Sequence, residues 1–511
     1  MKRPFRRIAA LLLGLSLLAG CGQTQPAPEE PSDPPPQQPV QSAEQTQTVA
    51  YGLAYDPNYG VNPYTAVSQT NRVFLPLCYE SLFAVTGQFT AEPLLAASYT
   101  VSDDERTYTI TLRSGIAFSN GAPLTAADVV ASLQAARASS YYGSRLSDMT
   151  GVSAPDESTV VITLSTAYCS LPLLLDVPIV QSGTAGNDIP IGTGEYVLVS
   201  GSGVLQPNKF WWRSDSRFGG QTITLTAAAD AQTVREVFER GTVTLACADP
   251  NAVGAAVYHS DYELWDSPTT VMEYLGFNPQ RNLFAGAEVR SAVTYCIDRA
   301  SLVQSSFGSF ALAATLPASP LSPFYDPALA SQYAYDSATA KQRLESVLPE
   351  EPEGIFLVCS DDSKRVAVAQ TLVQILNSYG FQLELTAVSQ SQYERILQAG
   401  SYDLYFGQTR LTANFDLTPF FAGSLSYGGI GTAEMAELCS AALENEGNYY
   451  ELHKTIMDQG LLCPLLFRSN AVYTTRGAFT DLTPAPGNVF YHALQAEAQE
   501  NTLSQRPPPP L

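Results

Sequence analysis

Three polar side chains that could hold an ionic group of a small solute lie within seven residues: Arg410, Asn414 and Asp416. An arginine guanidinium stays protonated and can make a forked contact with a carboxylate or a phosphate. Asn414 and Asp416 can supply further polar contacts. A structural alternative stays open, in which Arg410 pairs with a neighbouring acid and Asp416 caps the following helix.

The other residues that could do chemistry do not form a recognisable motif. Seven cysteines besides Cys21 contain no CxxC spacing, and most have apolar neighbours, which predicts buried free thiols. The three histidines are isolated, which argues against a histidine-based metal site. We find no GxSxG, no HExxH and no nucleotide-binding loop, so we expect neither an enzyme nor a cofactor.

The charge balance excludes one class of partner. The chain has 511 residues, 45% of them hydrophobic, and a formal net charge of −22. Nucleic-acid binding depends on clustered Lys and Arg side chains that contact phosphates, so a nucleic-acid partner is not expected.

The length is enough for two or three domains with a sizeable buried core.

The N-terminal residues have the pattern of a targeting signal. A cationic start, MKRPFRR, precedes an apolar stretch that is too short for a permanent membrane span, and the sequence LAGC at 18–21 resembles the bacterial lipobox. We therefore expect a signal peptide over 1–20 and a lipid anchor on Cys21. A Pro/Gln-rich linker over 21–48 follows, and residues 501–511, with four consecutive prolines, are expected not to pack.

The candidate residues need a scaffold, and periodicity and capping signals predict its elements. The first half reads as mixed α+β with antiparallel strands, including a helix over about 69–80 and one over 126–136 that Thr125 caps. Further on, strands alternate with amphipathic helices, which predicts parallel pairing. The expected elements there are strands 355–359, 381–387 and 403–406, and helices 363–379 and 390–399.

The change of pattern near Met272 predicts two lobes. Lobe I is expected to comprise residues 49–271 and 471–500, with an inserted subdomain over about 78–190, and lobe II to comprise residues 272–470.

Four segments resemble the bacterial extracellular solute-binding proteins of family 5, which serve peptide and nickel ABC importers. They are EPLLAASY through YTITLRSGIAFSNGAPLTAADVV at 92–130, GTGEY at 192–196, FN with VRSAVTYCIDR at 277–299, and YD with AK at 335–341. The resemblance implies an α/β, two-lobed periplasmic-binding-protein-like fold (type II, cluster C) with an extra α+β subdomain in the first lobe. It also implies a monomer, anchored outside the cytoplasm, that closes over a solute and delivers it to permease subunits with a cytoplasmic ATPase.

The resemblance also points to the candidate site. In peptide binders of the family, a Trp-containing strand and an Ala-Asp-Tyr segment provide the aspartate that pairs with the ligand's amino group. The corresponding stretch here, 402–421, lacks the Trp, and the usual first aspartate aligns with Ala413. Tyr274 and Asn278 are further candidates, because they lie on the strand expected to cross between the lobes. An oligopeptide-like solute is the leading hypothesis; a signalling-peptide receptor and a binder of nickel or another small solute are the alternatives.

Overall fold

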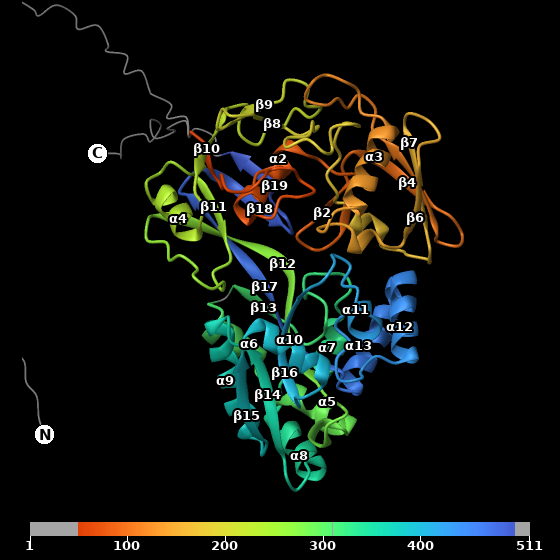
Figure 1. The fold of residues 1–511 in the computed structure, drawn as a ribbon, viewed down its shortest axis with the longest axis vertical. Helices are drawn as coiled ribbons and strands as arrows, with labels where there is room; N and C mark the ends of the chain where they lie inside the picture. Colours follow the sequence, from red (N-terminus) through yellow and green to blue (C-terminus); the bar gives the residue numbers. More distant parts are fainter. Residues whose placement is uncertain (1–49, 309, 496–511) are drawn as a thin grey trace, which may run out of the picture. The chain divides into compact units, whose positions relative to one another are not determined.

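A computed structural model describes residues 50–308 and 310–495 (Figure 1). The predicted signal peptide, Cys21, the linker and the tail over 501–511 lie outside the described residues. Below, lobe I denotes residues 50–271 with 471–495, and lobe II denotes residues 272–470. These boundaries remain a prediction, although the hydrophobic clusters divide close to them. No helix within the described ranges is long and apolar enough to cross a membrane.

A large mixed sheet runs through both lobes, in the order β15, β14, β16, β12, β17, β11, β1, β10, β9, β8. Its central pair is antiparallel and consists of two long strands, β12 (Tyr262–Phe277) and β17 (Leu462–Thr475). Each of these strands passes from one lobe into the other (Figure 1). The register between them shifts after Pro268 and again after Glu273, so the ladder is irregular where the lobes join.

Lobe II contains the predicted α/β unit. Strand β14 (Glu353–Cys359) pairs in parallel with β15 (Gln382–Val388) and with β16 (Leu404–Arg410), and the crossover helices are α9 (Ser363–Asn377) and α10 (Gln390–Ala399). Gly400 ends α10 at φ 66°, a left-handed conformation that glycine adopts without a steric penalty. The remaining regular elements of lobe II are α5 (Ala287–Cys296), α6 (Arg299–Ser306), β13 (Ala311–Ala313), α7 (Pro327–Gln332), α8 (Ser337–Val347), α11 (Thr418–Ala422), α12 (Ala433–Glu444) and α13 (Tyr449–Asp458).

Lobe I carries a separate four-stranded antiparallel sheet, in the order β4, β5, β7, β6, together with helix α3. Thr125 and Asp128 form a capping box at the start of α3, as the sequence predicts. The regular elements of this lobe are β1 (Gly52–Tyr55), β2 (Phe83–Val85), β3 (Ala91–Pro93), β4 (Ala96–Val101), β5 (Thr107–Leu112), α3 (Ala126–Arg137), β6 (Met149–Ser153), β7 (Thr159–Leu164), β8 (Tyr196–Val199), β9 (Val204–Pro207), β10 (Ile223–Ala227), α4 (Ala231–Glu239), β11 (Leu245–Ala248), β18 (Phe479–Ala485) and β19 (Asn488–Gln495).

The prediction of one continuous helix over 69–80 is wrong. The structure has two short helices there, α1 (Gln69–Arg72) and α2 (Leu75–Cys78). Pro76 explains the break, because its ring has no N–H to donate to the carbonyl of Arg72, four residues earlier, and would clash with that carbonyl.

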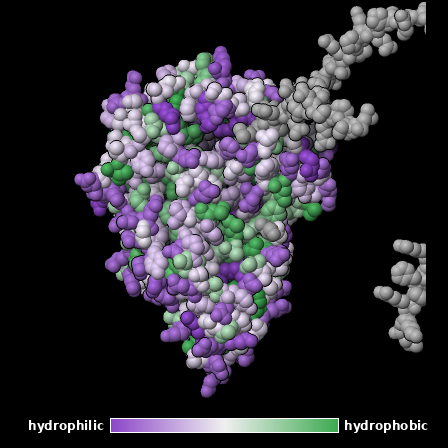
Figure 2. Space-filling view, turned by 180° about the vertical axis from the view of Figure 1, so that it is seen from behind, coloured by the Kyte–Doolittle hydropathy of each residue, from purple (hydrophilic) through white to green (hydrophobic). Residues whose placement is uncertain are grey.

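Three side chains of lobe I belong to the hydrophobic core of lobe II: Val85, Phe89 and Leu173. All three are buried, and Phe89 has no exposed surface. The two lobes therefore touch through packed side chains as well as through the long strands. The seven described cysteines are free thiols, as the sequence predicts. On the face seen in Figure 2, hydrophilic residues predominate and hydrophobic ones are interspersed among them.

Candidate functional site

A cavity of roughly 170 Å³ opens between the lobes, and we call it the interlobe cavity. The end of β16 and the loop after it form one wall, and the segment before β6, together with Tyr168, forms the other. Its lining residues are Ser144, Arg145, Ser147, Asp148 and Tyr168 of lobe I, and Thr409, Arg410, Leu411, Thr412, Asp416, Pro419 and Leu425 of lobe II. Both ionic candidates from the sequence, Arg410 and Asp416, are among them.

Arg410 is the last residue of β16, where that strand pairs with Val271 of β12. Its side chain is exposed and makes no hydrogen bond or ion pair with any described residue, so the structural alternative of a neighbouring acid finds no support. The guanidinium is thus available to an anionic group that enters the cavity.

Asp416 is more enclosed. Its Oδ1 accepts a hydrogen bond from the backbone N–H of Thr418 at 2.8 Å, an Asx turn at the start of α11. Burial raises the pKa of Asp416 from its usual range, the Thr418 hydrogen bonds oppose this, and the nearby Asp148 carboxylate raises the pKa further. Asp148 comes from lobe I and accepts a hydrogen bond from the Ser165 hydroxyl at 2.8 Å. Two carboxylates from opposite lobes therefore face one space, which suits a cationic group.

Asn414, unlike Arg410 and Asp416, does not line the cavity but bonds to lobe I. Its side chain is fully buried, and its amide donates to the Tyr168 hydroxyl at 2.8 Å and to the Ser170 Oγ at 3.2 Å, both in lobe I. The Tyr449 hydroxyl donates to the Asn414 backbone carbonyl at 2.5 Å. Asn414 thus lies beside the cavity and links the lobes; it is not among the lining residues.

Tyr274 and Asn278 lie in the interior of lobe II and do not line the interlobe cavity. The Tyr274 ring packs edge-on against Tyr405 and Phe420. The Asn278 amide donates to the carbonyls of Gly400, at 2.9 Å, and Tyr402, at 3.0 Å, and so holds the end of α10 beside the start of β16. In this conformation both side chains support the scaffold of the lobe.

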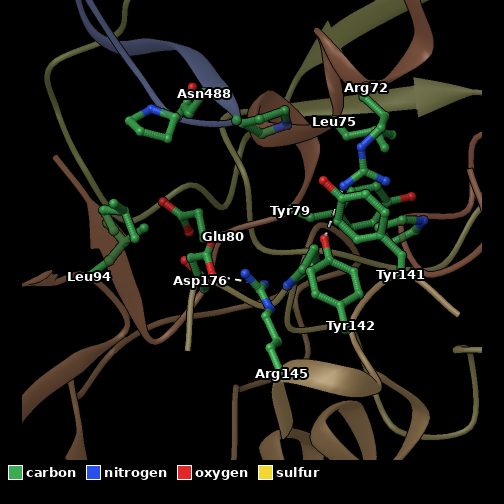
Figure 3. A pocket seen from close by; sticks show the side chains of 18 of the residues that line it. Arg72, Leu75, Tyr79, Glu80, Leu94, Tyr141, Tyr142, Arg145, Asp176 and Asn488 are labelled. Carbon is green, nitrogen blue, oxygen red and sulfur yellow. Dashed lines mark hydrogen bonds and ion pairs between the residues drawn. The ribbon is translucent and has the colours of Figure 1, made fainter. Parts of the chain in front are cut away.

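A second cavity, which we call the lobe I cavity, adjoins the first through the shared residue Arg145 (Figure 3). Arg145 pairs with Asp176 at 2.8 Å, and the Arg72 guanidinium stacks over the Tyr141 ring at 3.5 Å. Glu80 also borders it. Burial raises the pKa of Glu80, and hydrogen bonds from Thr193, Trp212 and Trp211 oppose that shift. The two cavities together offer charges of both signs and aromatic walls.

Sequence reasoning missed the lobe I wall of the interlobe cavity. Ser144 to Asp148 and Tyr168 belong to no motif, and they meet β16 only through the tertiary fold. The one local signal is composition, since the segment YYGSRLSD at 141–148 is rich in aromatic and polar residues without strand or helix periodicity.

Comparison with known proteins identifies the family. The sequence model of the bacterial extracellular solute-binding proteins, family 5 (middle region), matches residues 90–432. The chain belongs to this family. A curated relative is the glutathione-binding protein GsiB of Salmonella typhi, which is 27% identical over 392 residues that cover 71% of this chain and 75% of the relative.

Solved structures confirm the predicted fold class of this family 5 protein. HbpA2 from Haemophilus parasuis superposes with a TM-score of 0.73 at 18% identity, covering 88% of this chain and 99% of the other. The ABC transporter substrate-binding protein CtaP from Listeria monocytogenes gives a TM-score of 0.70 at 19% identity, with coverages of 88% and 99%. The fold is the two-lobed, α/β, type II fold of periplasmic binding proteins. Family 5 proteins are the solute-binding components of ABC importers.

Proposed function

We propose that this protein captures an oligopeptide-like solute between its lobes and delivers it, unchanged, to the permease of an ABC importer. The observation that carries the proposal is the charge arrangement of the interlobe cavity. Arg410 offers an unpaired guanidinium, and Asp148 and Asp416 offer carboxylates from the two lobes. A short peptide has the complementary pair of groups, a carboxylate and an ammonium.

The placement of these groups links recognition to closure. Arg410 and Asp416 belong to lobe II and Asp148 to lobe I, so a solute that contacts all three binds the closed form more tightly than the open form. Differential affinity of this kind is what allows a ligand to shift a conformational equilibrium. The name of the relative GsiB, a glutathione-binding protein, supports a peptide-like cargo. The proposed lipid anchor on Cys21 would hold the protein at the outer face of the membrane, as a monomer beside its permease.

The proposal is tested by identifying and then rebinding the solute. Small molecules that co-purify with the mature protein are released from the native complex and identified by mass spectrometry, and the same compounds are added to emptied protein in a thermal shift assay. A peptide-like solute should raise the melting temperature, because it binds only the folded state. Release of only metal ions or of sugars, with no peptide response, would contradict the proposal.

The role of Arg410 has a matched control. In Arg410→Ala the solute-induced rise in melting temperature should disappear, while the melting temperature without solute stays within about 2 °C of the parent, as expected for a surface change. Arg395→Ala, an exposed arginine on α10 in the same lobe, should leave both values unchanged. Equal losses with and without solute in Arg410→Ala would assign Arg410 to the scaffold.

A further inference from the structure

The lobe I cavity, of roughly 130 Å³, lies within a single lobe. Its lining residues fall in three stretches, 63–94, 141–178 and 486–488, with Arg217 besides, and all of them belong to lobe I. The cavity therefore does not depend on the angle between the lobes. Arg145 lines both this cavity and the interlobe cavity, so a solute held between the lobes can extend a side chain into lobe I.

Three arginines line this cavity, and one of them has no acidic partner. Arg145 pairs with Asp176 at 2.8 Å, and Arg217 contacts Glu195 at 3.8 Å. Arg72 is half-buried and makes no ion pair within the described part of the chain. A guanidinium without a counter-ion leaves a positive charge on the cavity wall, and burial makes such a charge costly until an anion meets it.

The remaining acid on the lining, Glu80, does not supply that anion. Its carboxylate accepts from the Thr193 hydroxyl at 2.8 Å and from the indole N–H groups of Trp211, at 3.3 Å, and Trp212, at 3.0 Å. The nearby cation that opposes the rise in the pKa of Glu80 is Arg217. Figure 3 shows Glu80 apart from Arg72, so neutral donors hold it at another part of the cavity.

The Arg72 guanidinium is held in a fixed plane. It stacks over the Tyr141 ring, 3.5 Å from the ring centroid. Its Nη1 donates to the Ala66 carbonyl at 3.1 Å, and its Nη2 donates to the Tyr142 hydroxyl at 3.4 Å. These bonds use only part of the N–H donors that an arginine carries. The others remain for a ligand, and an oriented guanidinium matches the geometry of a carboxylate.

The Tyr142 side chain lies between those of Arg72 and Arg145 (Figure 3). The Arg145 guanidinium is 4.7 Å from the Tyr142 ring centroid. Its Nε and Nη2 are buried and make no regular hydrogen bond with a described residue, although Asp176 is in contact. Burial raises the pKa of Tyr142 to about 12, so its hydroxyl stays protonated at neutral pH and does not neutralise the arginines. Buried donors without acceptors are costly, which indicates a site for an acceptor from outside.

We propose that Arg72, Arg145 and the Tyr142 hydroxyl bind an acidic side chain of the solute, so that the protein prefers peptides that contain Asp or Glu. This inference rests on the proposed function and deepens it, because it names the class of peptide. Under that function Arg410 takes one carboxylate in the interlobe cavity, so the group in the lobe I cavity is a second anion. A neutral glutamine side chain has nearly the same shape but gains less from two guanidiniums.

The test compares matched peptides by titration calorimetry with the mature chain. The probes are alanine tripeptides and pentapeptides in which one position is Glu, each with a counterpart that has Gln there. At least one Glu peptide should bind about 10-fold to 100-fold more tightly than its Gln counterpart, the value of charge-assisted hydrogen bonds. Because the two side chains are similar in size, the difference reports the charge.

Arg72 is the residue to vary, because it lines the lobe I cavity and not the interlobe cavity. Arg72→Gln should remove most of the preference by weakening the Glu peptide alone, and Arg72→Lys, which keeps the charge but loses the fork, should retain part of it. Arg137→Gln alters an exposed arginine of α3 in the same lobe, outside both cavities, and should keep the whole preference. If Arg72→Gln does not fold, Tyr142→Phe removes the hydroxyl alone and should reduce the preference to a lesser degree.

The outcomes separate this inference from the proposed function. Peptides that bind equally well with Glu or Gln would overturn the inference and leave the proposed function standing. So would an Arg72→Gln protein that binds both peptides less tightly by the same factor, since Arg72 would then belong to the scaffold. Binding of no peptide would contradict the proposed function itself, and this inference with it.

Inorganic phosphate is the probe for a free anion at the same arginines. Under the inference it should not raise the melting temperature at the concentrations at which the Glu peptides do. A rise with phosphate that Arg72→Gln abolishes, together with no preference for Glu, would assign the site to a free anion and overturn the inference.

Discussion

Asp148 of lobe I and Asp416 of lobe II line the same cavity. Burial raises the pKa of Asp416, and the Asp148 carboxylate raises it further. Neither carboxylate has a lysine, arginine or histidine partner among the described residues. Two like charges in one space are stabilised when a cation lies between them. Under the proposed function, the ammonium group of a solute would lie between these two carboxylates, one from each lobe.

Replacing Asp148 by Asn should weaken solute binding at neutral pH by about 10-fold to 100-fold, the value of a charge-assisted hydrogen bond. It should also change the pH dependence. In the parent protein the affinity for a cationic group falls as acid protonates Asp416, and this begins at a higher pH than for an ordinary aspartate, because the pKa of Asp416 is raised. Asp148→Asn lowers that pKa and moves the loss to lower pH. Titration calorimetry from pH 4 to pH 7 reports both effects; unchanged affinity at every pH would remove Asp148 from the site.

The charge cluster where the lobes join should matter for stability. Glu273 of β12 is fully buried between Arg365 and Arg468, at 3.5 Å from each, and Arg468 also pairs with Asp249 of lobe I at 2.9 Å. Removing one partner of a buried pair leaves an uncompensated charge, so Arg468→Met should cost about 3–5 kcal/mol of the free energy of unfolding. Urea unfolding measures it. In a double-mutant cycle, Glu273→Gln together with Arg468→Met should cost less than the two single costs added; strict additivity would show that the pair does not interact.

Much of the fold could be predicted because its signals are local. Asp298, Asp336 and Gly400 occupy caps of the helices that the sequence predicts, and the alternation of strands and helices after β14 gives the parallel pairing that is observed. The helix predicted over 69–80 is interrupted in the structure, because Pro76 cannot continue the hydrogen bonding of α1 into α2. The sequence does not predict the full length of β12 or its pairing with β17, because that ladder joins residues about 200 positions apart and is buried along most of its length.

Only the lobe II part of the candidate site could be predicted from the sequence, because only that part lies in one continuous segment. Arg410 and Asp416 stand in a stretch that the family resemblance marks, and the structure places both on the cavity. Asp148 and Tyr168 come from another lobe, so nothing near them in sequence indicates their role. Asn414 has the composition of a ligand contact, but its amide is already bonded to lobe I, a distinction that only packing decides.

The proposed anchor gives a prediction at the N-terminus. Cys21→Ser should release the mature protein from the membrane fraction into the soluble extracytoplasmic fraction, because the serine hydroxyl does not receive the diacylglycerol. Fractionation with immunoblotting, and metabolic labelling with a fatty acid, test it. Cys169→Ser is a control, since that cysteine lies within the folded body and should not affect fractionation. Membrane association that survives Cys21→Ser would refute the anchor.

His453 should limit stability in acid. It lies on α13, fully buried against Tyr449, its Nε2 has no hydrogen-bond partner within the described structure, and burial lowers its pKa from 6.5 to about 3. In the unfolded chain the same imidazole takes up a proton below about pH 6.5. The unfolded state then binds more protons than the folded state, so this residue makes the free energy of unfolding fall as the pH drops from 6.5 toward 3.

The size of the effect follows from the linkage relation. The contribution of one such group approaches about 1.4 kcal/mol per pH unit well below 6.5. His453→Leu fills a similar volume without a titratable group. Its free energy of unfolding, measured by urea unfolding at pH 6, 5 and 4, should therefore rise relative to that of the parent protein as the pH falls, by an amount per pH unit that approaches this value. His259→Gln alters an exposed histidine and should run parallel to the parent. Because the raised-pKa carboxylates are common to all three proteins, they cancel in the difference, and a His453→Leu curve parallel to the parent would mean that His453 is already protonated or accessible in the folded state.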